Sequence, residues 1–449
     1  MALPSILANI TVPLVGIVDT AIVGHLADAA AIGGIAIGTM LFDLLYWNFG
    51  FLRAGTAGMT AQAYGKRTPD TEGGGAGETT EILVQSVSIA LTGALLILLL
   101  QWVFVTVVLW LVPCSVEVAE FARRYFYIRV WAAPATLTLM ALKGWFIGMQ
   151  NTMAAMVTDL VVNITNMLAS WLLAVYTPLG AMGVAWGTLI AQYAGLLTAA
   201  VLLSAVIRKS KTNSANNAVR ESLRVRLASV LSWRKIRRLL VLNGNLFIRS
   251  LCFMVIYVGF TSLAAKYGDT ELAVSSIIMK LFMLFSYFID GFAFAGEALT
   301  GRFIGGKDKA MVDEAVRILF FWSVCMGLMC TALYAFSGTW FIELMTNQPD
   351  VIEASRPYII WLVLMPVVSC LAFMWDGIFV GATAGSELRN CMIWSAVGFL
   401  VTYISLNNIM GIQSLYLAYF VHLVVRAIYL TLRWKQTENN MVEWVGNNR

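Results

Sequence analysis

The sequence predicts an all-α integral membrane protein with twelve transmembrane helices, arranged as two six-helix bundles related by a pseudo-two-fold axis along the membrane normal. Three observations predict this fold class. The composition is 59% hydrophobic and 12% charged, with a mean hydropathy of +0.78, which leaves too few polar residues to cover a water-soluble domain. The second observation is a series of long apolar windows, and the third is an internal repeat.

Twelve windows are long and apolar enough to cross a bilayer, which takes about 20 residues. The first window does not resemble a cleavable signal peptide, because Asp19 interrupts it and no small-residue cleavage site precedes a soluble domain. We therefore expect it to remain as a membrane span. The windows begin near Ser5, Ala31, Ile82, Phe121, Met153, Met182, Leu239, Leu272, Val316, Tyr358, Met392 and Ile412.

The distribution of charge predicts the domains and the orientation. We predict an N-terminal lobe at residues 1–207, a basic linker at 208–238, and a C-terminal lobe with a short tail at 239–449. The linker holds ten of the 30 Lys and Arg residues and one acid, Glu221. We expect a multi-pass protein of the bacterial inner membrane. Because positive charge marks the cytoplasmic side of a membrane protein, we expect the linker and both termini to lie in the cytoplasm. Topology explains the basic loop without a nucleic-acid partner.

The two lobes repeat each other in sequence. A shift of 241 positions pairs Gly50 with Gly291 inside a longer match, and a second match pairs Pro134 with Pro366. Six is an even number, so the two lobes insert into the membrane in the same orientation. Parallel repeats of this kind are typical of transporters in which one bundle rocks against the other.

Other motifs exclude several classes of protein. Glycines four residues apart, as at Gly34/Gly38 and Gly183/Gly187, indicate close helix packing. No phosphate-binding loop of the GxxxxGK[ST] type is present, so we do not expect ATP hydrolysis. The six cysteines and two histidines form no metal-binding pattern, and no catalytic cluster predicts an enzyme. We expect no cofactor other than a coupling ion.

Polar residues within the apolar windows predict a site in the N-terminal lobe. An ionised side chain such as Asp19 at a helix centre costs roughly 2.5–3.5 kcal/mol on the translocon scale, so it should face a cavity or a partner. Asp19 is therefore either a residue that takes and releases protons or a permanently paired carboxylate. The fifth window carries a polar stripe about 60° wide, which indicates either a cavity wall or hydrogen bonds between helices. The stripe consists of Thr152, Asp159, Asn163, Asn166 and Ser170.

The C-terminal lobe carries a second polar cluster. Asp290 and Glu297 share one helical face, whereas their counterparts in the repeat are uncharged. Arg249, in the preceding helix, is expected to neutralise one of these acids, and a structural ion pair and a proton relay both remain open. Lys143 and Asp376 are interpreted as topological charges near helix ends.

Three ordered motifs carry a resemblance to a known family. They are the run from Leu3 to Leu26, the segment Gly58-Met-Thr-Ala-Gln-Ala-Tyr-Gly65, and the segment Asp290-Gly-Phe-Ala-Phe-Ala-Gly-Glu297-Ala. Together they resemble the multidrug and toxic compound extrusion (MATE) family, and more narrowly its DinF-like branch. The resemblance covers nearly the whole chain.

The resemblance implies a cation-coupled antiporter that exports lipophilic, often cationic compounds by alternating access. It also implies that the cation site lies in the N-terminal lobe, on Asp19, Asn166, Ser170 and Thr188. Many relatives carry an aspartate where this chain has Ser170. Because the missing carboxylate is an oxygen ligand that Na⁺ favours, we expect H⁺ to be the coupling ion, with Na⁺ coupling as the alternative.

The expected partners are small-molecule substrates and membrane lipid, with no nucleic acid, and we expect a monomer. The main alternative function is a flippase or exporter of a lipid-linked or amphipathic anionic substrate. Such a protein is expected to line its cleft with several cationic residues. The few cations that we find within the spans are Arg53, Arg129, Arg249 and Lys280.

Overall fold

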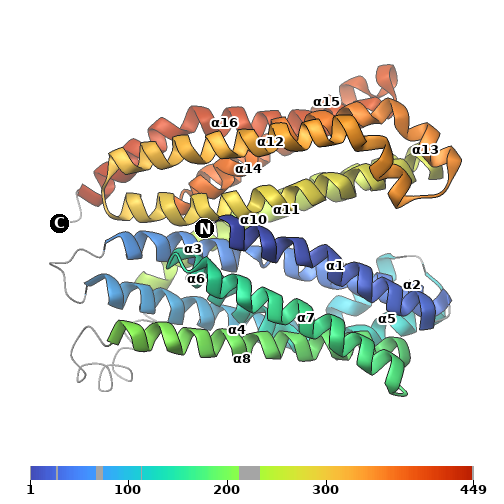
Figure 1. Cartoon of the computed structure of the whole chain (residues 1–449), viewed down its shortest axis with the longest axis horizontal. Helices are drawn as coiled ribbons and strands as arrows, with labels where there is room; N and C mark the ends of the chain where they lie inside the picture. The colour runs from blue at the N-terminus through green and yellow to red at the C-terminus, as the bar shows by residue number, and fades with distance from the viewer. Residues whose placement is uncertain (1, 27–28, 67–73, 113, 212–232, 447–449) are drawn as a thin grey trace. The chain divides into compact units, whose positions relative to one another are not determined.

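The computed structural model describes residues 2–26, 29–66, 74–112, 114–211 and 233–446. Within these ranges, twelve helical stretches are long and apolar enough to cross a bilayer, and the regular structure is entirely helical (Figure 1). The predicted fold class is therefore confirmed. Most of the predicted linker, residues 212–232, lies outside the described residues.

The N-terminal half supplies six of the spans, and two of them are interrupted. The second span consists of two helices, and the fourth contains a short 3₁₀ turn. The elements are α1 (Ala2–Leu26), α2 (Ala29–Trp47), α3 (Gly50–Gly65), α4 (Gly74–Leu111), α5 (Val116–Arg129), η1 (Val130–Ala132), α6 (Ala133–Gly148), α7 (Thr152–Tyr176), η2 (Gly180–Met182) and α8 (Gly183–Lys211).

The C-terminal half supplies the other six spans, and its second span is one continuous helix. The elements are α10 (Trp233–Ala264), η3 (Ala265–Tyr267), α11 (Asp269–Gly305), α12 (Lys309–Met345), α13 (Pro349–Ser355), η4 (Arg356–Tyr358), α14 (Ile359–Gly381), α15 (Gly385–Met410) and α16 (Gln413–Gly446).

The break between α2 and α3 distinguishes the two halves of the repeat. At the break the side-chain amide of Asn48 donates to the carbonyl of Leu44, at 2.7 Å, which competes with the backbone bond that continues a helix. The residue aligned with Asn48 in the repeat is Ile289, which is fully buried within α11. The helix is thus broken in the half that has the polar Asn48 and continuous in the half that has the apolar Ile289.

The chain forms two compact units. The first, called here the N-unit, consists of Leu7–Thr60 and Ala76–Val241. The second, called the C-unit, consists of Met1–Ile6, Ala61–Gly75 and Leu242–Arg449. Each has its own apolar core, which includes Phe42 and Phe126 in the N-unit and Phe282 and Tyr419 in the C-unit.

The units differ from the predicted lobes at the end of α3. There the side-chain amide of Gln62 donates to the carbonyl of Gly381, at 3.0 Å. A Cβ atom added to Gly305 would lie 2.0 Å from the carbonyl oxygen of Gln62, so only glycine permits this approach. The last turns of α3 are consequently packed with α11 and α14.

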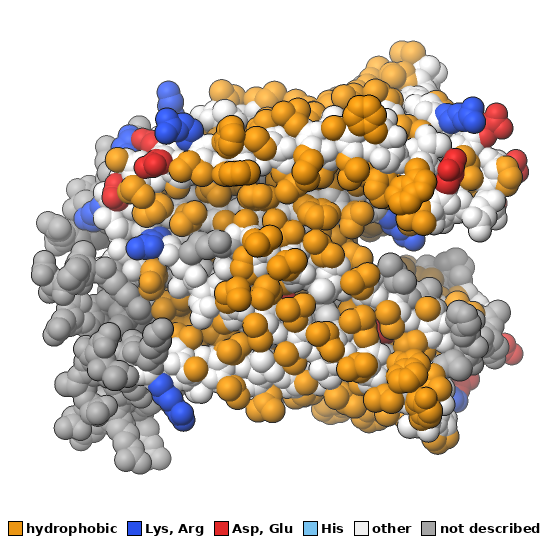
Figure 2. Space-filling view, viewed as in Figure 1, with side chains coloured by type: hydrophobic (Ala, Val, Ile, Leu, Met, Phe, Trp, Pro, Cys, Tyr) orange, Lys and Arg blue, Asp and Glu red, His pale blue; other side chains and the backbone are white. Residues whose placement is uncertain are grey.

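The flanks of the helices are suited to lipid. Large apolar side chains are exposed along α4, α8, α12 and α15, including Leu99, Leu197, Phe321 and Ile404. Figure 2 shows hydrophobic side chains along the helices and most charged side chains near the helix ends. Because exposed apolar surface on this scale is unfavourable in water, the chain is a multi-pass membrane protein.

Candidate functional site

The polar stripe predicted on the fifth window lies on α7, where part of it faces α8. The side-chain amide of Asn166 donates to the hydroxyl of Thr188, at 3.0 Å, and that hydroxyl donates to the carbonyl of Val184. Both side chains are buried. The amide oxygen of Asn166 is buried too, and it makes no hydrogen bond within the described part of the chain.

Ser170 lies one turn further along α7, at a point where α7 and α8 approach closely. It is fully buried, and a Cβ atom added to Gly187 would lie 2.4 Å from its hydroxyl oxygen. Glycine at 187 therefore creates the room that the Ser170 side chain occupies. The packing role predicted for the Gly183/Gly187 pair is confirmed, because a Cβ on Gly183 would lie 2.5 Å from the backbone nitrogen of Ala174.

The carboxyl group of Asp19 on α1 lies beside Ser170. The Ser170 hydroxyl and the Arg129 guanidinium both lie near enough to this carboxyl group to interact with it electrostatically. The Asp19 and Ser170 groups approach without hydrogen-bond geometry, since Oδ1 of Asp19 and Oγ of Ser170 are buried without a hydrogen-bond partner among the described residues. The structure thus brings together the four residues that the family resemblance implies, from α1, α7 and α8.

Arg129, the last residue of α5, lies near the same carboxyl group. Its Nη1 donates to the Tyr125 hydroxyl at 2.9 Å, and its Cζ lies 4.7 Å from the centre of the Phe42 ring, a cation–π distance. It interacts electrostatically with Asp19 and with Asp43 of α2. With both carboxylates ionised, Asp19, Asp43 and Arg129 together carry one negative charge.

The other two polar residues predicted for the N-terminal cavity bridge helices. The Asn163 amide donates to the Thr11 hydroxyl at 2.5 Å, which links α7 to α1. Asp159 forms an ion pair with Lys143 of α6, at 2.7 Å between Oδ1 and Nζ. Both of these last side chains are about a quarter exposed. Lys143, interpreted from the sequence as a topological charge, is thus part of an interhelical ion pair.

The C-unit holds a buried ionic cluster built from α10, α14 and α16. Arg249 donates from Nη2 to Oδ2 of Asp376 at 2.5 Å, and Arg426 donates to the same oxygen. Arg249 was expected to neutralise Asp290 or Glu297, but the pair that the structure shows is with Asp376. Asp376 is consequently a buried ion-pair partner, although its position near a helix end had indicated a topological charge.

Asp290 and Glu297 both lie on α11 within the same unit. Glu297 is buried and Asp290 is half-buried, and each takes part in further interactions. Their alignment on one helical face follows from their spacing of seven residues.

One face of α16 completes the ionic cluster. The ring of His422 lies 4.4 Å from that of Tyr419, and its Nδ1 contacts the Tyr419 carbonyl. The Cys391 thiol donates to the Arg426 carbonyl at 3.8 Å. The Arg426 guanidinium lies 5.4 Å from the centre of the Phe373 ring. His422 and Arg426 are buried to 0% and 1% exposure.

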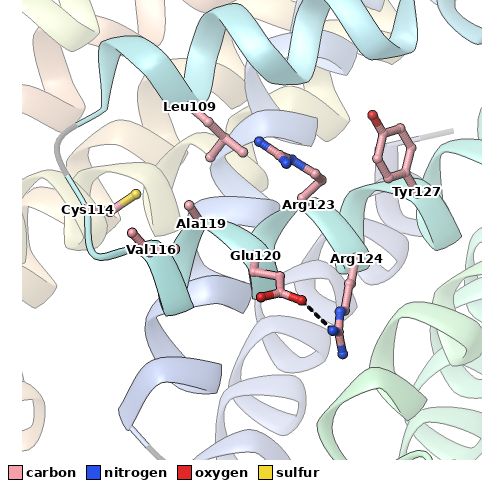
Figure 3. A pocket seen from close by; sticks show the side chains of 8 residues that line it. All are labelled: Leu109, Cys114, Val116, Ala119, Glu120, Arg123, Arg124 and Tyr127. Atoms are coloured by element: carbon pink, nitrogen blue, oxygen red, sulfur yellow. Dashed lines mark hydrogen bonds and ion pairs between the residues drawn. The ribbon is translucent and has the colours of Figure 1, made fainter.

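A surface cavity of about 530 Å³ lies at the junction of α4 and α5 (Figure 3). Arg123 and Tyr127 line it, and an ion pair between Arg124 and Glu120 crosses its rim. None of the predicted site residues lines this cavity.

Sequence reasoning did not select Asp43, Arg129, Asp376, His422 or Arg426 as site residues. The signal that selected Asp19, a charged residue within an apolar window, was present for Arg129 and Arg426 as well. Their acidic partners could not be found from periodicity, because Asp19, Asp43 and Asp376 lie on other helices than the arginines that they face.

The comparison with protein families gives a match to the MatE family model, over residues 4–172 and 246–409. Among curated relatives, the chain is 34% identical to DNA damage-inducible protein F of Escherichia coli (strain K12), over 98% of this chain and 92% of that protein. It is also 22% identical to Protein DETOXIFICATION 44, chloroplastic, of Arabidopsis thaliana, over 95% of this chain and 80% of that protein.

Solved structures share the fold. A multidrug resistance MATE family transporter of the MOP superfamily, in an outward-facing conformation, matches with a TM-score of 0.84 and 17% identity, over 98% of this chain and 95% of that chain. A MOP superfamily transporter from Pyrococcus furiosus matches with a TM-score of 0.83 and 16% identity, over the same shares.

Proposed function

Because this chain belongs to the MatE family of membrane transporters, we propose that it is a proton-coupled antiporter that exports lipophilic or cationic compounds by alternating access. Efflux transport itself follows from the family, whose members are transporters and not enzymes. The coupling ion, the coupling residues and the substrate class are the proposal.

The observation that carries the proposal is a group of buried oxygen atoms in the N-unit that make no hydrogen bond within the described part of the chain. The carboxylate oxygen Oδ1 of Asp19 and the amide oxygen of Asn166 are buried and accept no hydrogen bond from the described residues, and the Ser170 hydroxyl beside them also has no such partner. Buried polar atoms are normally satisfied. Oxygen atoms without donors fit a site that receives a proton or a small hard cation during transport.

The charges favour one monovalent ion. Asp19, Asp43 and Arg129 sum to one negative charge, which a single proton or a single Na⁺ neutralises. We favour the proton because Asp19 is the one carboxylate that the described residues place beside Ser170, and Na⁺ coordination prefers several oxygen ligands with more negative charge. Na⁺ coupling is the alternative outcome of the test below.

The exchange cycle follows from this neutralisation. In the outward-open state a proton binds Asp19, which removes the negative charge that holds a cationic substrate, and the substrate leaves. In the inward-open state the proton leaves to the cytoplasm, and the charged site binds the next substrate. Both ligands bias the same equilibrium between two states, which is the physical meaning of coupling.

We further propose that the protein lies in the bacterial inner membrane with both termini in the cytoplasm. One chain contains both six-helix lobes, so we propose that the monomer is the transporting unit.

The test is efflux of ethidium from inside-out vesicles under an imposed pH gradient, and then under a Na⁺ gradient. We expect the pH gradient alone to drive the wild type and Asp19→Asn to lose transport by at least about tenfold, the loss that follows from removing a group worth about 1.4 kcal/mol or more to the cycle.

The matched control is Asp43→Asn, which removes the other carboxylate near Arg129 and should retain proton-driven transport in part. Size-exclusion profiles establish that both variants fold. Transport driven by Na⁺ alone would refute proton coupling, and transport by neither gradient would refute the substrate class.

A further inference from the structure

The ionic cluster of the C-unit has more positive than negative charge. Arg249 and Arg426 both donate to one oxygen of Asp376, so these three side chains sum to one positive charge. The Arg426 side chain is only 1% exposed. Burial of an arginine is unfavourable unless a carboxylate and further acceptors satisfy it, and one shared oxygen does not satisfy two guanidinium groups.

The same cluster has more hydrogen-bond donors than acceptors. Four buried donor atoms have no hydrogen-bond partner among the described residues: Nε of Arg249, Nε and Nη1 of Arg426, and the hydroxyl of Tyr419. Tyr419 and Arg426 also interact electrostatically with each other, so their unpartnered donors lie in one region of the C-unit.

The surroundings of these donors are apolar and aromatic. The Tyr419 ring lies 5.4 Å from that of Phe260 and 5.7 Å from that of Phe282, and the Arg426 guanidinium lies over Phe373. The cluster reaches the surface of the C-unit at Arg249, whose side chain is 25% exposed, and at Asp376, which is 11% exposed. A group that enters beside Arg249 would thus meet guanidinium donors within an apolar wall.

We propose that the Arg249–Asp376–Arg426 cluster binds the carboxylate of an amphipathic substrate, and that Asp376 occupies the arginine donors when the substrate is absent. The proposal rests on the efflux function proposed above and adds to its substrates amphipathic compounds that carry a carboxylate, zwitterions included. Arginine binds carboxylates through two parallel N–H donors. Nε and Nη2 of Arg426 form such a pair, and Asp376 holds Nη2 until a substrate carboxylate replaces it.

The test is equilibrium dialysis of the purified full-length protein, in nanodiscs of phosphatidylcholine, against norfloxacin and against its methyl ester. The two compounds differ only in the carboxylate. We expect the wild type to bind norfloxacin about tenfold more tightly than the ester, the ratio that corresponds to one hydrogen bond to a charged group.

Two substitutions should move this preference in opposite directions. Arg249→Gln removes the partly exposed guanidinium and should lower the preference for norfloxacin about tenfold, whereas Asp376→Asn removes the competing carboxylate and should raise the affinity several-fold. Arg433→Gln is the matched control. Arg433 lies on α16, the helix of Arg426, and forms a more exposed pair with Glu387 of α15, so the binding of this variant should equal that of the wild type.

Equal binding of acid and ester by the wild type would overturn the proposal. Weaker norfloxacin binding by both Arg249→Gln and Asp376→Asn would overturn it too, because that result indicates a structural brace. If phosphatidylglycerol in the nanodiscs abolishes the preference, the site holds a lipid headgroup and the assignment to a transported carboxylate is wrong. Equilibrium binding does not depend on an ion gradient. The dialysis therefore tests the carboxylate site even if proton coupling through Asp19 proves wrong.

Discussion

At the scale of single residues, Ser170 decides how much negative charge the N-unit site contains. It is fully buried beside Asp19, and its hydroxyl contributes an oxygen without a charge. Ser170→Asp would place a second carboxylate there, and two adjacent carboxylates cannot both stay ionised without a bound cation. We expect this variant to gain several-fold stimulation of ethidium efflux by a Na⁺ gradient at fixed pH.

The control for this variant is Ser204→Asp, which introduces the same charge at an exposed position near the C-terminal end of α8. Na⁺ stimulation in both variants, or in neither, would contradict the role assigned to position 170.

The pair Lys143 and Asp159 tests whether the polar stripe on α7 is a cavity wall or a brace between helices. The 2.7 Å ion pair links α6 to α7, and we predict that it is a brace. Lys143→Gln or Asp159→Asn alone leaves one charge unpaired within a span and should lower the thermal stability, whereas the double variant should recover it. Partial exposure limits the coupling energy to roughly 1 kcal/mol.

The measurement is a double-mutant cycle on thermal unfolding, with ethidium efflux recorded for the same four proteins. A double variant that regains stability but not transport would assign Asp159 to substrate binding, contrary to this prediction.

At the scale of secondary structure, the contact of α7 with α8 positions Asn166, Ser170 and Thr188, the proposed coupling residues on these helices. Gly187 lies where a Cβ atom would come within 2.4 Å of Oγ and 2.5 Å of the backbone nitrogen of Ser170. Gly187→Ala should therefore separate the two helices, cost about 1–3 kcal/mol of stability and disrupt the bond between Asn166 and Thr188. Thermal unfolding and proton-driven efflux both measure this effect.

Gly77→Ala, near the start of α4, is the matched control, because a Cβ atom there meets nothing within 4 Å. A wild-type melting temperature and normal efflux for Gly187→Ala would show that the helices do not depend on this close approach.

At the scale of the whole molecule, the distribution of Lys and Arg predicts the orientation in the membrane. Ten of these residues lie between residues 208 and 238, and positive charge is retained in the cytoplasm. Green fluorescent protein fused after Arg449 should fluoresce, and alkaline phosphatase fused there should be inactive. Alkaline phosphatase inserted after Asn347, between α12 and α13, should be active. The reverse pattern would invert the proposed topology and the direction of transport with it.

The sequence by itself determined the class of protein, the twelve spans and the repeat. These properties depend on apolar window length and on local periodicity, and both are properties of neighbouring residues in the chain. The selection of Asp19 also followed from the chain alone, because a charge inside a span is unfavourable wherever the helix packs. The roles of the coupling residues remain a prediction that the efflux experiments test.

Only the tertiary structure decided which charges meet. Arg249 pairs with Asp376, 127 residues away, where the sequence had suggested Asp290 or Glu297. Arg426 and Arg129 gain their importance from partners on other helices, and the end of α3 belongs with the C-unit because Gln62 reaches Gly381. Such pairings depend on how helices rotate and approach one another in the lipid, and helical periodicity fixes which residues share a face but not what that face meets.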